Sequence, residues 1–188
     1  LVHSSIKDQM VGKLRERAEK IKQGNPLDPA TTMGAMVDVN HAKKVEEFLN
    51  VGKAEAKLIT GGDRFSINDS DAFIQPTIFA DVSEDATIAR DEIFGPVLAI
   101  QTFDTEDEAI KLANKSVYGL AASVWTSELA RAMDLSGKLH VGTVSVNTVD
   151  ALSAMTPFGG MKQSGFGRDL SIHSFDKYTA LKTIWVKY

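Results

Sequence analysis

The sequence predicts an α/β fold in which helices cover both faces of a parallel sheet. Three apolar runs, at residues 97–103, 120–125 and 141–146, alternate with segments of helical character at 104–114 and 127–136. The runs are almost continuously apolar, as expected for parallel strands that are buried on both faces. The succession of strand, helix and strand also predicts right-handed crossover connections.

The N-terminal part is expected to form two helices joined by a loop. Ser5 can cap the first helix, with Asp8 as its third residue, and Gly24 offers a left-handed end. The buried stripe of this helix consists of Ile6, Met10, Leu14, Ala18 and Ile21. Residues 25–37 are rich in Pro, Thr and Gly and predict a loop, after which Asn40 begins the second helix.

Shorter strands are expected on either side of the regular region. Residues 57–60 predict a strand that Gly61 and Gly62 end, and strands near residues 73–79 are expected to extend the same sheet. Residues 179–188 alternate between apolar and polar side chains, which predicts one further strand at the end of the chain.

Composition and charge exclude several classes of protein. The 188 residues carry a formal net charge of −4 and contain no cysteine, so disulfides and thiolate metal sites are excluded. An acidic balance argues against a nucleic-acid partner, which needs a basic face to replace counterions at the phosphates. No apolar run approaches the roughly 18 residues that span a bilayer and no leader pattern is present, so we expect no membrane contact and a cytoplasmic location.

No group of residues predicts a metal site or a phosphate loop. His3, His41, His140 and His173 do not have the spacing of a zinc site and are expected at the surface or at helix ends. Residues 68–71 lack the later glycine and glutamate of a calcium loop and predict a turn. The glycines at 159, 160, 165 and 167 lack the spacing of a dinucleotide fingerprint and are expected to allow tight turns beside a site.

Several short motifs occur in one order along the second half of the chain. They are Asp91 to Val97; Leu112 to Asn114 with Tyr118 to Ala122; Gly142 and Thr143 with Val146 and Asn147; and Pro157 to Gly160 with Lys162 to Gly165. In this order and spacing they resemble the motifs of NAD(P)-dependent aldehyde dehydrogenases, and Leu1 to Gly24 is similar to the segment that follows the nucleophile of that family. The resemblance implies the C-terminal part of a Rossmann-like catalytic domain at 1–177 and an oligomerisation strand at 178–188.

The resemblance also implies a mechanism and a set of site residues. In this family a cysteine thiolate attacks the aldehyde, hydride passes to the nicotinamide of NAD or NADP, and a glutamate-activated water releases the acid. Glu92 matches the carboxylate that accepts hydrogen bonds from the nicotinamide ribose, and Phe94 matches the aromatic packed beside it. Phe158 matches a wall of the substrate tunnel, whose mouth the loop 148–156, with Asp150, is expected to line.

The chain departs from the family pattern because it has no cysteine. The resemblance places the nucleophile a few residues before Leu1, and the general-base glutamate and the oxyanion-hole asparagine further upstream. We therefore expect a fragment of an aldehyde dehydrogenase that has no catalytic residue of its own and is inactive alone. Two alternatives stay open: a non-catalytic, stand-alone interaction protein with the same fold, and an enzyme that passes the acyl group to coenzyme A.

The C-terminal part of the chain implies a substrate class and an assembly. Residues 165–185 resemble the aldehyde dehydrogenases of polyamine breakdown, which oxidise ω-amino, guanidino or γ-glutamylamino aldehydes, and Asp150 would attract the cationic end of such a substrate.

The strand at 178–188 is too apolar to stay in water, since it carries Leu181, Ile184 and Trp185. It is expected to pair with the sheet of a neighbouring subunit in a homodimer or homotetramer.

Overall fold

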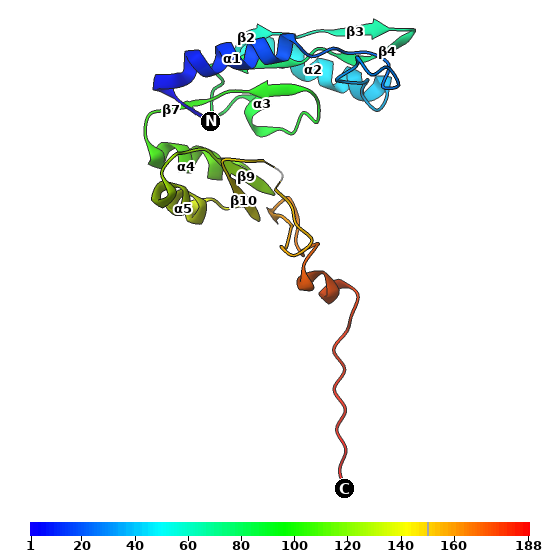
Figure 1. Cartoon of the computed structure of the whole chain (residues 1–188), viewed down its shortest axis with the longest axis vertical. Coiled ribbons are helices and arrows are strands. Elements are labelled where there is room, and N and C mark those ends of the chain that lie inside the picture. The colour runs from blue at the N-terminus through cyan, green and yellow to red at the C-terminus, as the bar shows by residue number, and fades with distance from the viewer. Residues whose placement is uncertain (150) are drawn as a thin grey trace. The chain divides into compact units, whose positions relative to one another are not determined.

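The computed structural model describes residues 1–149 and 151–188 and divides the chain into two compact units (Figure 1). The first unit comprises residues 1–109 and the second residues 110–188. Both contain helices together with a parallel pair of strands, which confirms the predicted α/β class. Among the described residues, no helix is long and apolar enough to cross a membrane.

The first unit opens with β1 (Val2–His3), the 3-10 helix η1 (Ser4–Ile6) and α1 (Lys7–Glu19). The prediction that Ser5 caps the first helix is wrong, since Ile6 precedes α1 and makes no side-chain cap. The Ser5 hydroxyl instead lies 2.8 Å from Nδ1 of His3. The helix also ends before Gly24, whose N–H donates to the Met33 carbonyl at 3.2 Å within the following loop.

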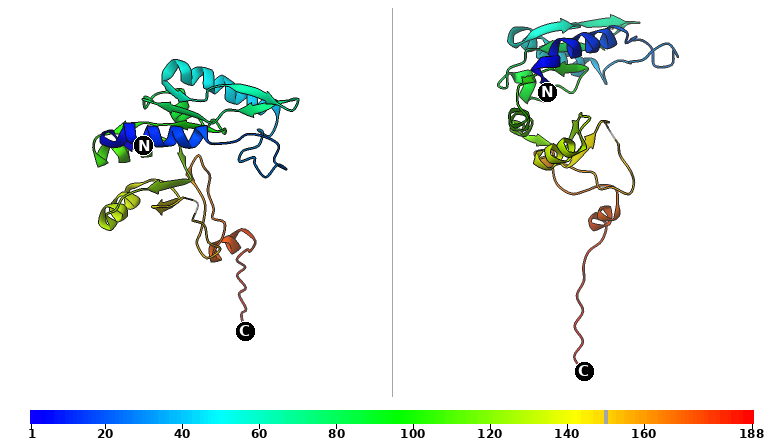
Figure 2. Two further views of the ribbon diagram at one scale, coloured as in Figure 1. Left: turned by 45° about the horizontal axis from the view of Figure 1, so that its top comes forward. Right: turned by 60° about the vertical axis from the view of Figure 1, so that its left-hand side comes forward.

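The second helix, α2 (Val39–Glu55), begins at Val39 rather than at the predicted Asn40. Its N-cap is Asp38, whose side chain accepts a hydrogen bond of 2.7 Å from the backbone N–H of His41. The buried residues recur at helical spacing, and they are Ala42, Val45, Leu49 and Gly52. In the left view of Figure 2, the strands of this unit lie between α2 and α1.

The central sheet of the first unit has the strand order β2–β5–β6, formed by Lys57–Thr60, Thr77–Ala80 and Val97–Ala99. β5 pairs in parallel with β6, whereas β2 is antiparallel to β5. The helix α3 (Thr87–Arg90) follows β5. The core members are Ala42, Val45, Leu49, Ala72, Ile74, Phe79, Val82, Ala86 and Ile88.

A separate antiparallel hairpin consists of β3 (Arg64–Ile67) and β4 (Ser70–Ile74). Of the turn predicted at residues 68–71, Asn68 and Asp69 join these strands, whereas Ser70 and Asp71 already belong to β4. Asn68 and Asp69 have φ angles of 46° and 63°, as a two-residue hairpin turn of the primed type requires.

The apolar run 97–103 is two strands rather than one, because the chain changes its hydrogen-bonding partner within it. Next to β6, the N–H of Ile100 donates to the Phe79 carbonyl of β5 at 2.9 Å. Beyond this point, the N–H of Val2 donates to the Gln101 carbonyl at 2.9 Å, and β7 (Thr102–Phe103) pairs in parallel with β1. The prediction of one continuous strand is therefore corrected.

The second unit is built around the parallel pair β9 (Ala121–Val124) and β10 (Thr143–Val146), which α5 (Leu129–Lys138) connects. This confirms the predicted succession of strand, helix and strand. α4 (Glu106–Lys115) precedes the pair, and β8 (Tyr118–Gly119) is antiparallel to β11 (Met161–Lys162). Among the described residues the strands form several small sheets, so the single sheet expected from the sequence is not continuous in this chain.

Residues 179–188 form no strand in the part of the chain that the structure describes, although their alternation predicted one. The last helical element is η2 (Ile172–Lys177). The apolar side chains beyond it are largely exposed, and they are Tyr178, Leu181, Ile184, Trp185, Val186 and Tyr188. An extended segment gains ladder hydrogen bonds only from a neighbouring strand, and among the described residues none pairs with this one.

Two helical glycines should respond oppositely to alanine. An added Cβ at Gly12 in α1 would meet nothing within 4 Å, whereas at Gly52 in α2 it would lie 2.7 Å from the Phe79 ring. Gly12→Ala should raise the free energy of unfolding by about 0.5–1 kcal/mol through helix propensity, and Gly52→Ala should lower it by about 1–3 kcal/mol through overpacking. Urea titrations followed by circular dichroism measure both, and a gain in stability at Gly52 would contradict this packing.

Candidate functional site

Glu92 and Phe94 lie in the first unit, in the loop between α3 and β6. Glu92 is exposed, and Phe94 is 73% exposed. Phe94 has a φ of 55°, in the left-handed region that bulky L-residues rarely occupy. Such a conformation costs about 1–3 kcal/mol and persists only where the surrounding structure imposes it, often at functional sites. Both residues expected at the cofactor therefore lie on one short, strained loop.

His41 of α2 contacts this loop directly. Its Nε2 lies 2.7 Å from the Phe94 carbonyl oxygen, and the two rings meet edge to face with centroids 6.1 Å apart. The first turn of α2 thus holds the backbone of Phe94 while the Phe94 ring stays largely exposed. Sequence reasoning expected His41 only at the surface or at a helix end, because nothing in the sequence connects position 41 with position 94.

The next two residues of the loop are fixed by the core. An added Cβ at Gly95 would lie 2.9 Å from both methyl groups of the buried Val45, so a larger residue requires α2 to move. The N–H of Thr77, in β5, donates to the Pro96 carbonyl at 2.9 Å. Phe94, Gly95 and Pro96 are therefore each held by a different residue of the first unit.

Phe158 lies in the second unit and is half-buried. It forms an isolated antiparallel bridge with Asp169, with backbone hydrogen bonds of 2.9 and 2.7 Å, and Lys177 pairs with the Asp169 carboxylate. The Gly159 carbonyl approaches Gly142 so closely that an added Cβ at Gly142 would lie 1.7 Å from its oxygen. Glycine at position 142 is therefore required for the backbone beside Phe158 to take this course.

Asn147, which has a φ of 53°, lies between β10 and the loop 148–156. The N–H of Thr126 donates to Oδ1 of Asn147 at 2.9 Å, and Nδ2 of Asn147 donates to the Thr126 carbonyl at 2.8 Å. Thr126 follows β9, so these two hydrogen bonds connect the carboxyl ends of two parallel strands. Open α/β sheets bind ligands at this edge. Asp150 lies outside the described residues, and its expected role stays a prediction.

Other motif residues join elements of the second unit. Asn114 donates from Nδ2 to the Lys138 carbonyl and accepts at Oδ1 from the N–H of His140, both at 2.8 Å, which links the ends of α4 and α5. Nζ of Lys162 donates to the carbonyls of Asn114 and Ser116 at 3.0 and 2.9 Å. These hydrogen bonds give the motifs around Asn114 and Lys162 a structural role.

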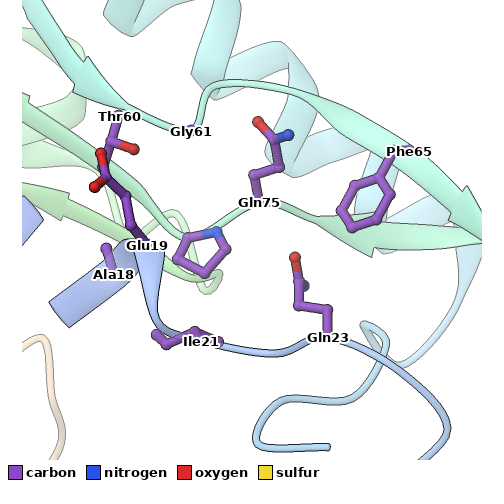
Figure 3. A pocket seen from close by; sticks show the side chains of 9 residues that line it. Ala18, Glu19, Ile21, Gln23, Thr60, Gly61, Phe65 and Gln75 are labelled. Carbon is purple, nitrogen blue, oxygen red and sulfur yellow. The ribbon is translucent and has the colours of Figure 1, made fainter. Parts of the chain in front are cut away.

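A cavity of about 330 Å³ lies in the first unit between α1 and the strands (Figure 3). It is lined by Ala18, Glu19, Ile21, Gln23, Thr60, Gly61, Phe65, Gln75 and Pro76, and so by none of the expected site residues. Two of its polar side chains already have partners within the chain: Nε2 of Gln23 donates to the Ile74 carbonyl at 2.8 Å, and Glu19 pairs with Arg15 at 3.2 Å.

In the described part of the chain, no group of three or more His, Cys, Asp or Glu residues could hold a metal ion.

Comparison with known proteins gives a consistent result. A family model described as "Aldehyde dehydrogenase family" matches residues 1–184. NADP/NAD-dependent aldehyde dehydrogenase PuuC of Escherichia coli is 45% identical over 186 residues, which are 99% of this chain and 37% of PuuC. Betaine aldehyde dehydrogenase of Sinorhizobium fredii is 45% identical over 187 residues, which are 98% of this chain and 38% of the relative. The chain thus spans little more than a third of the length of the curated relatives that it matches.

Solved structures agree with these sequence matches. Indole-3-acetaldehyde dehydrogenase AldA of P. syringae, a mutant in complex with NAD+ and IAA, is similar with a TM-score of 0.95 and 46% identity, over 100% of this chain and 38% of that one. Betaine aldehyde dehydrogenase of Staphylococcus aureus in complex with NAD+ is similar with a TM-score of 0.90 and 40% identity, over 95% of this chain and 36% of that one.

Proposed function

The chain belongs to the aldehyde dehydrogenase family, and from this membership we propose that it forms the cofactor- and substrate-facing part of an enzyme that oxidises aldehydes to carboxylic acids with NAD or NADP. The observation that carries the proposal is the loop that presents Glu92 and Phe94 together. The relatives named above include proteins described as NADP/NAD-dependent or solved with NAD+.

The chemistry of this loop suits a nicotinamide nucleoside. An exposed carboxylate such as that of Glu92 offers several lone-pair sites for the hydroxyl groups of a ribose. Phe94 offers a flat apolar ring two residues away, against which a nicotinamide can pack. NAD(P)+, when bound, supplies the hydride acceptor, and the role of the chain is to hold it in a reactive orientation.

The covalent part of the reaction needs a group from outside these 188 residues. The sequence contains no cysteine, so no thiol within it can attack the aldehyde carbonyl. Phe158 and the loop 148–156 would shape the substrate side of the site. The thiolate has to be supplied by polypeptide other than this chain, and the family resemblance implies the same origin for the general base.

A chimera tests the proposed function. In it, this chain replaces the segment of PuuC that it matches. The chimera should oxidise an aliphatic aldehyde with NAD+, whereas the 188-residue chain alone should show no turnover, because it lacks a thiol. Absorbance of the reduced cofactor at saturating substrate measures both.

Each alternative outcome of the chimera experiment has a definite meaning. A chimera with the circular dichroism and melting temperature of PuuC but no turnover would refute the enzyme assignment and favour a non-catalytic interaction protein. Turnover that requires coenzyme A would replace hydrolysis with acyl transfer. Turnover by the purified chain alone would contradict the need for an external thiolate.

Glu92→Gln in the chimera should slow hydride transfer by roughly tenfold or more, because a neutral amide accepts the ribose hydrogen bonds less strongly and misplaces the nicotinamide. Asp91→Asn is the matched control, since it removes the same charge from the neighbouring exposed position. Single-turnover absorbance measures the hydride step. Equal rates for Glu92→Gln and Asp91→Asn would remove the assigned role of Glu92.

The proposed substrate is an aldehyde of the ω-amino, guanidino or γ-glutamylamino class, whose far end carries an ammonium or guanidinium group. Two observations support it: Asp150 lies in the loop expected at the tunnel mouth, and several relatives are named for betaine aldehyde, itself a cation. The chimera should have a higher kcat/KM for an ω-aminoaldehyde than for an alkyl aldehyde of equal length, and Asp150→Asn should reduce that preference. Equal kcat/KM values would exclude this substrate class.

The exposed apolar tail supports the proposal that residues 178–188 form an oligomerisation strand beyond the 1–177 region. Its side chains would leave water, and its backbone would gain ladder hydrogen bonds, by pairing with a neighbouring subunit in a homodimer or homotetramer.

Removal of residues 178–188 should convert an oligomer into a monomer. Multi-angle light scattering should give at least a dimer for the whole chain and a monomer for the truncated one. Leu181→Ser with Trp185→Ser should weaken the dimer, whereas the control Lys182→Ser should not, because only the apolar side chains gain by burial. A monomer in every case would exclude assembly through the tail.

A further inference from the structure

We infer that His41 is a positioning residue for the cofactor side of the site: it fixes the Phe94 carbonyl and thereby holds the Glu92–Phe94 loop. The inference rests on the proposed function, and nothing in the sequence motifs points to position 41. The observations that carry it are the 2.7 Å contact from Nε2 to the Phe94 carbonyl and the edge-to-face ring contact.

In the contact between His41 and Phe94, the histidine is the hydrogen-bond donor. A carbonyl oxygen can only accept, so Nε2 of His41 carries the hydrogen and donates it. The backbone N–H of His41 is already bound by the Asp38 side chain at 2.7 Å, in the first turn of α2. The ring therefore projects from a capped and anchored helix turn, which makes it a fixed donor rather than a mobile surface histidine.

The His41 hydrogen bond matters because the backbone of Phe94 is strained. With a φ of 55°, Phe94 departs from the conformation that its side chain prefers, and its exposed ring gains little from burial that would keep it there. The contacts at Gly95 and Pro96 fix the residues that follow, whereas His41 acts on Phe94 itself. Removal of the His41 ring should therefore free the loop on the side of Glu92.

The expected signature is a change in cofactor binding and not in aldehyde binding. In the chimera, His41→Ala should raise KM for NAD+ by roughly three- to tenfold, the range that one hydrogen bond supplies, with KM for the aldehyde unchanged. His41→Gln should largely restore the value, because a glutamine amide N–H reaches a similar distance and also donates. Lys43→Ala serves as the control, because Lys43 is exposed and, two residues from His41 in α2, does not share its face of the helix.

Hydrogen exchange on the 188-residue chain tests the same inference without any turnover. His41→Ala should accelerate exchange in residues 91–97 several-fold while the amides of β5 keep their protection, and His41→Gln should resemble the unaltered chain. Unchanged exchange of 91–97 in His41→Ala, or an unchanged KM for NAD+ in an active chimera, would overturn the positioning role. An inactive unaltered chimera would instead refute the proposed function, and the exchange experiment would still decide the role of His41.

Discussion

Ala42, Val45 and Leu49 lie fully buried on one face of α2, and the Phe79 ring lies directly against Gly52 of the same helix. Burial of a valine or leucine side chain contributes about 1.5–3 kcal/mol, so this face sets where α2 lies. Its first turn then brings His41 to the loop after α3, and Val45 leaves room only for a glycine at position 95. A loop with a bulky left-handed residue cannot keep that conformation by itself, so the candidate site depends on this packed face.

The two units present an aromatic side chain in a similar way. In each, a phenylalanine precedes a glycine at a close approach: a Cβ at Gly95 would meet the Val45 methyl groups in the first unit, and the Gly159 carbonyl lies where a Cβ of Gly142 would be in the second. A glycine permits a backbone approach that no larger residue allows. The backbone next to Phe94 and the backbone next to Phe158 are thus each confined by a close approach at the glycine that follows.

Much of this fold follows from local patterns in the sequence. The helix α2 and the succession β9, α5 and β10 were predictable from the spacing of apolar residues, whereas the pairing of β5 with β6 was not specified beyond a strand expected near residues 73–79. The hairpin turn at Asn68 and Asp69 was predictable from residue type. The motif singled out Glu92 and Phe94, but neither their exposed loop nor its left-handed backbone was predicted.

The wrong or missing predictions depend on contacts between distant residues. Ser5 does not cap α1 because it lies within η1, where its hydroxyl contacts His3, and the run 97–103 breaks because its hydrogen bonds pass from β5 to β1. The role of His41 depends on a contact between positions 41 and 94, which no local pattern contains. The tail pattern predicts a strand, but a strand needs a partner, and none of the described residues supplies one.

Amide hydrogen exchange of Thr77, followed by NMR, tests most directly whether the core of the first unit holds the loop. The N–H of Thr77 donates to the Pro96 carbonyl at 2.9 Å, at the point where the loop joins β6. If the loop is built into the core, this amide should exchange as slowly as those of Ile78 and Phe79, through global unfolding alone. Exchange of Thr77 as fast as that of the exposed loop at residues 25–30 would show that the loop opens independently and would contradict the claim.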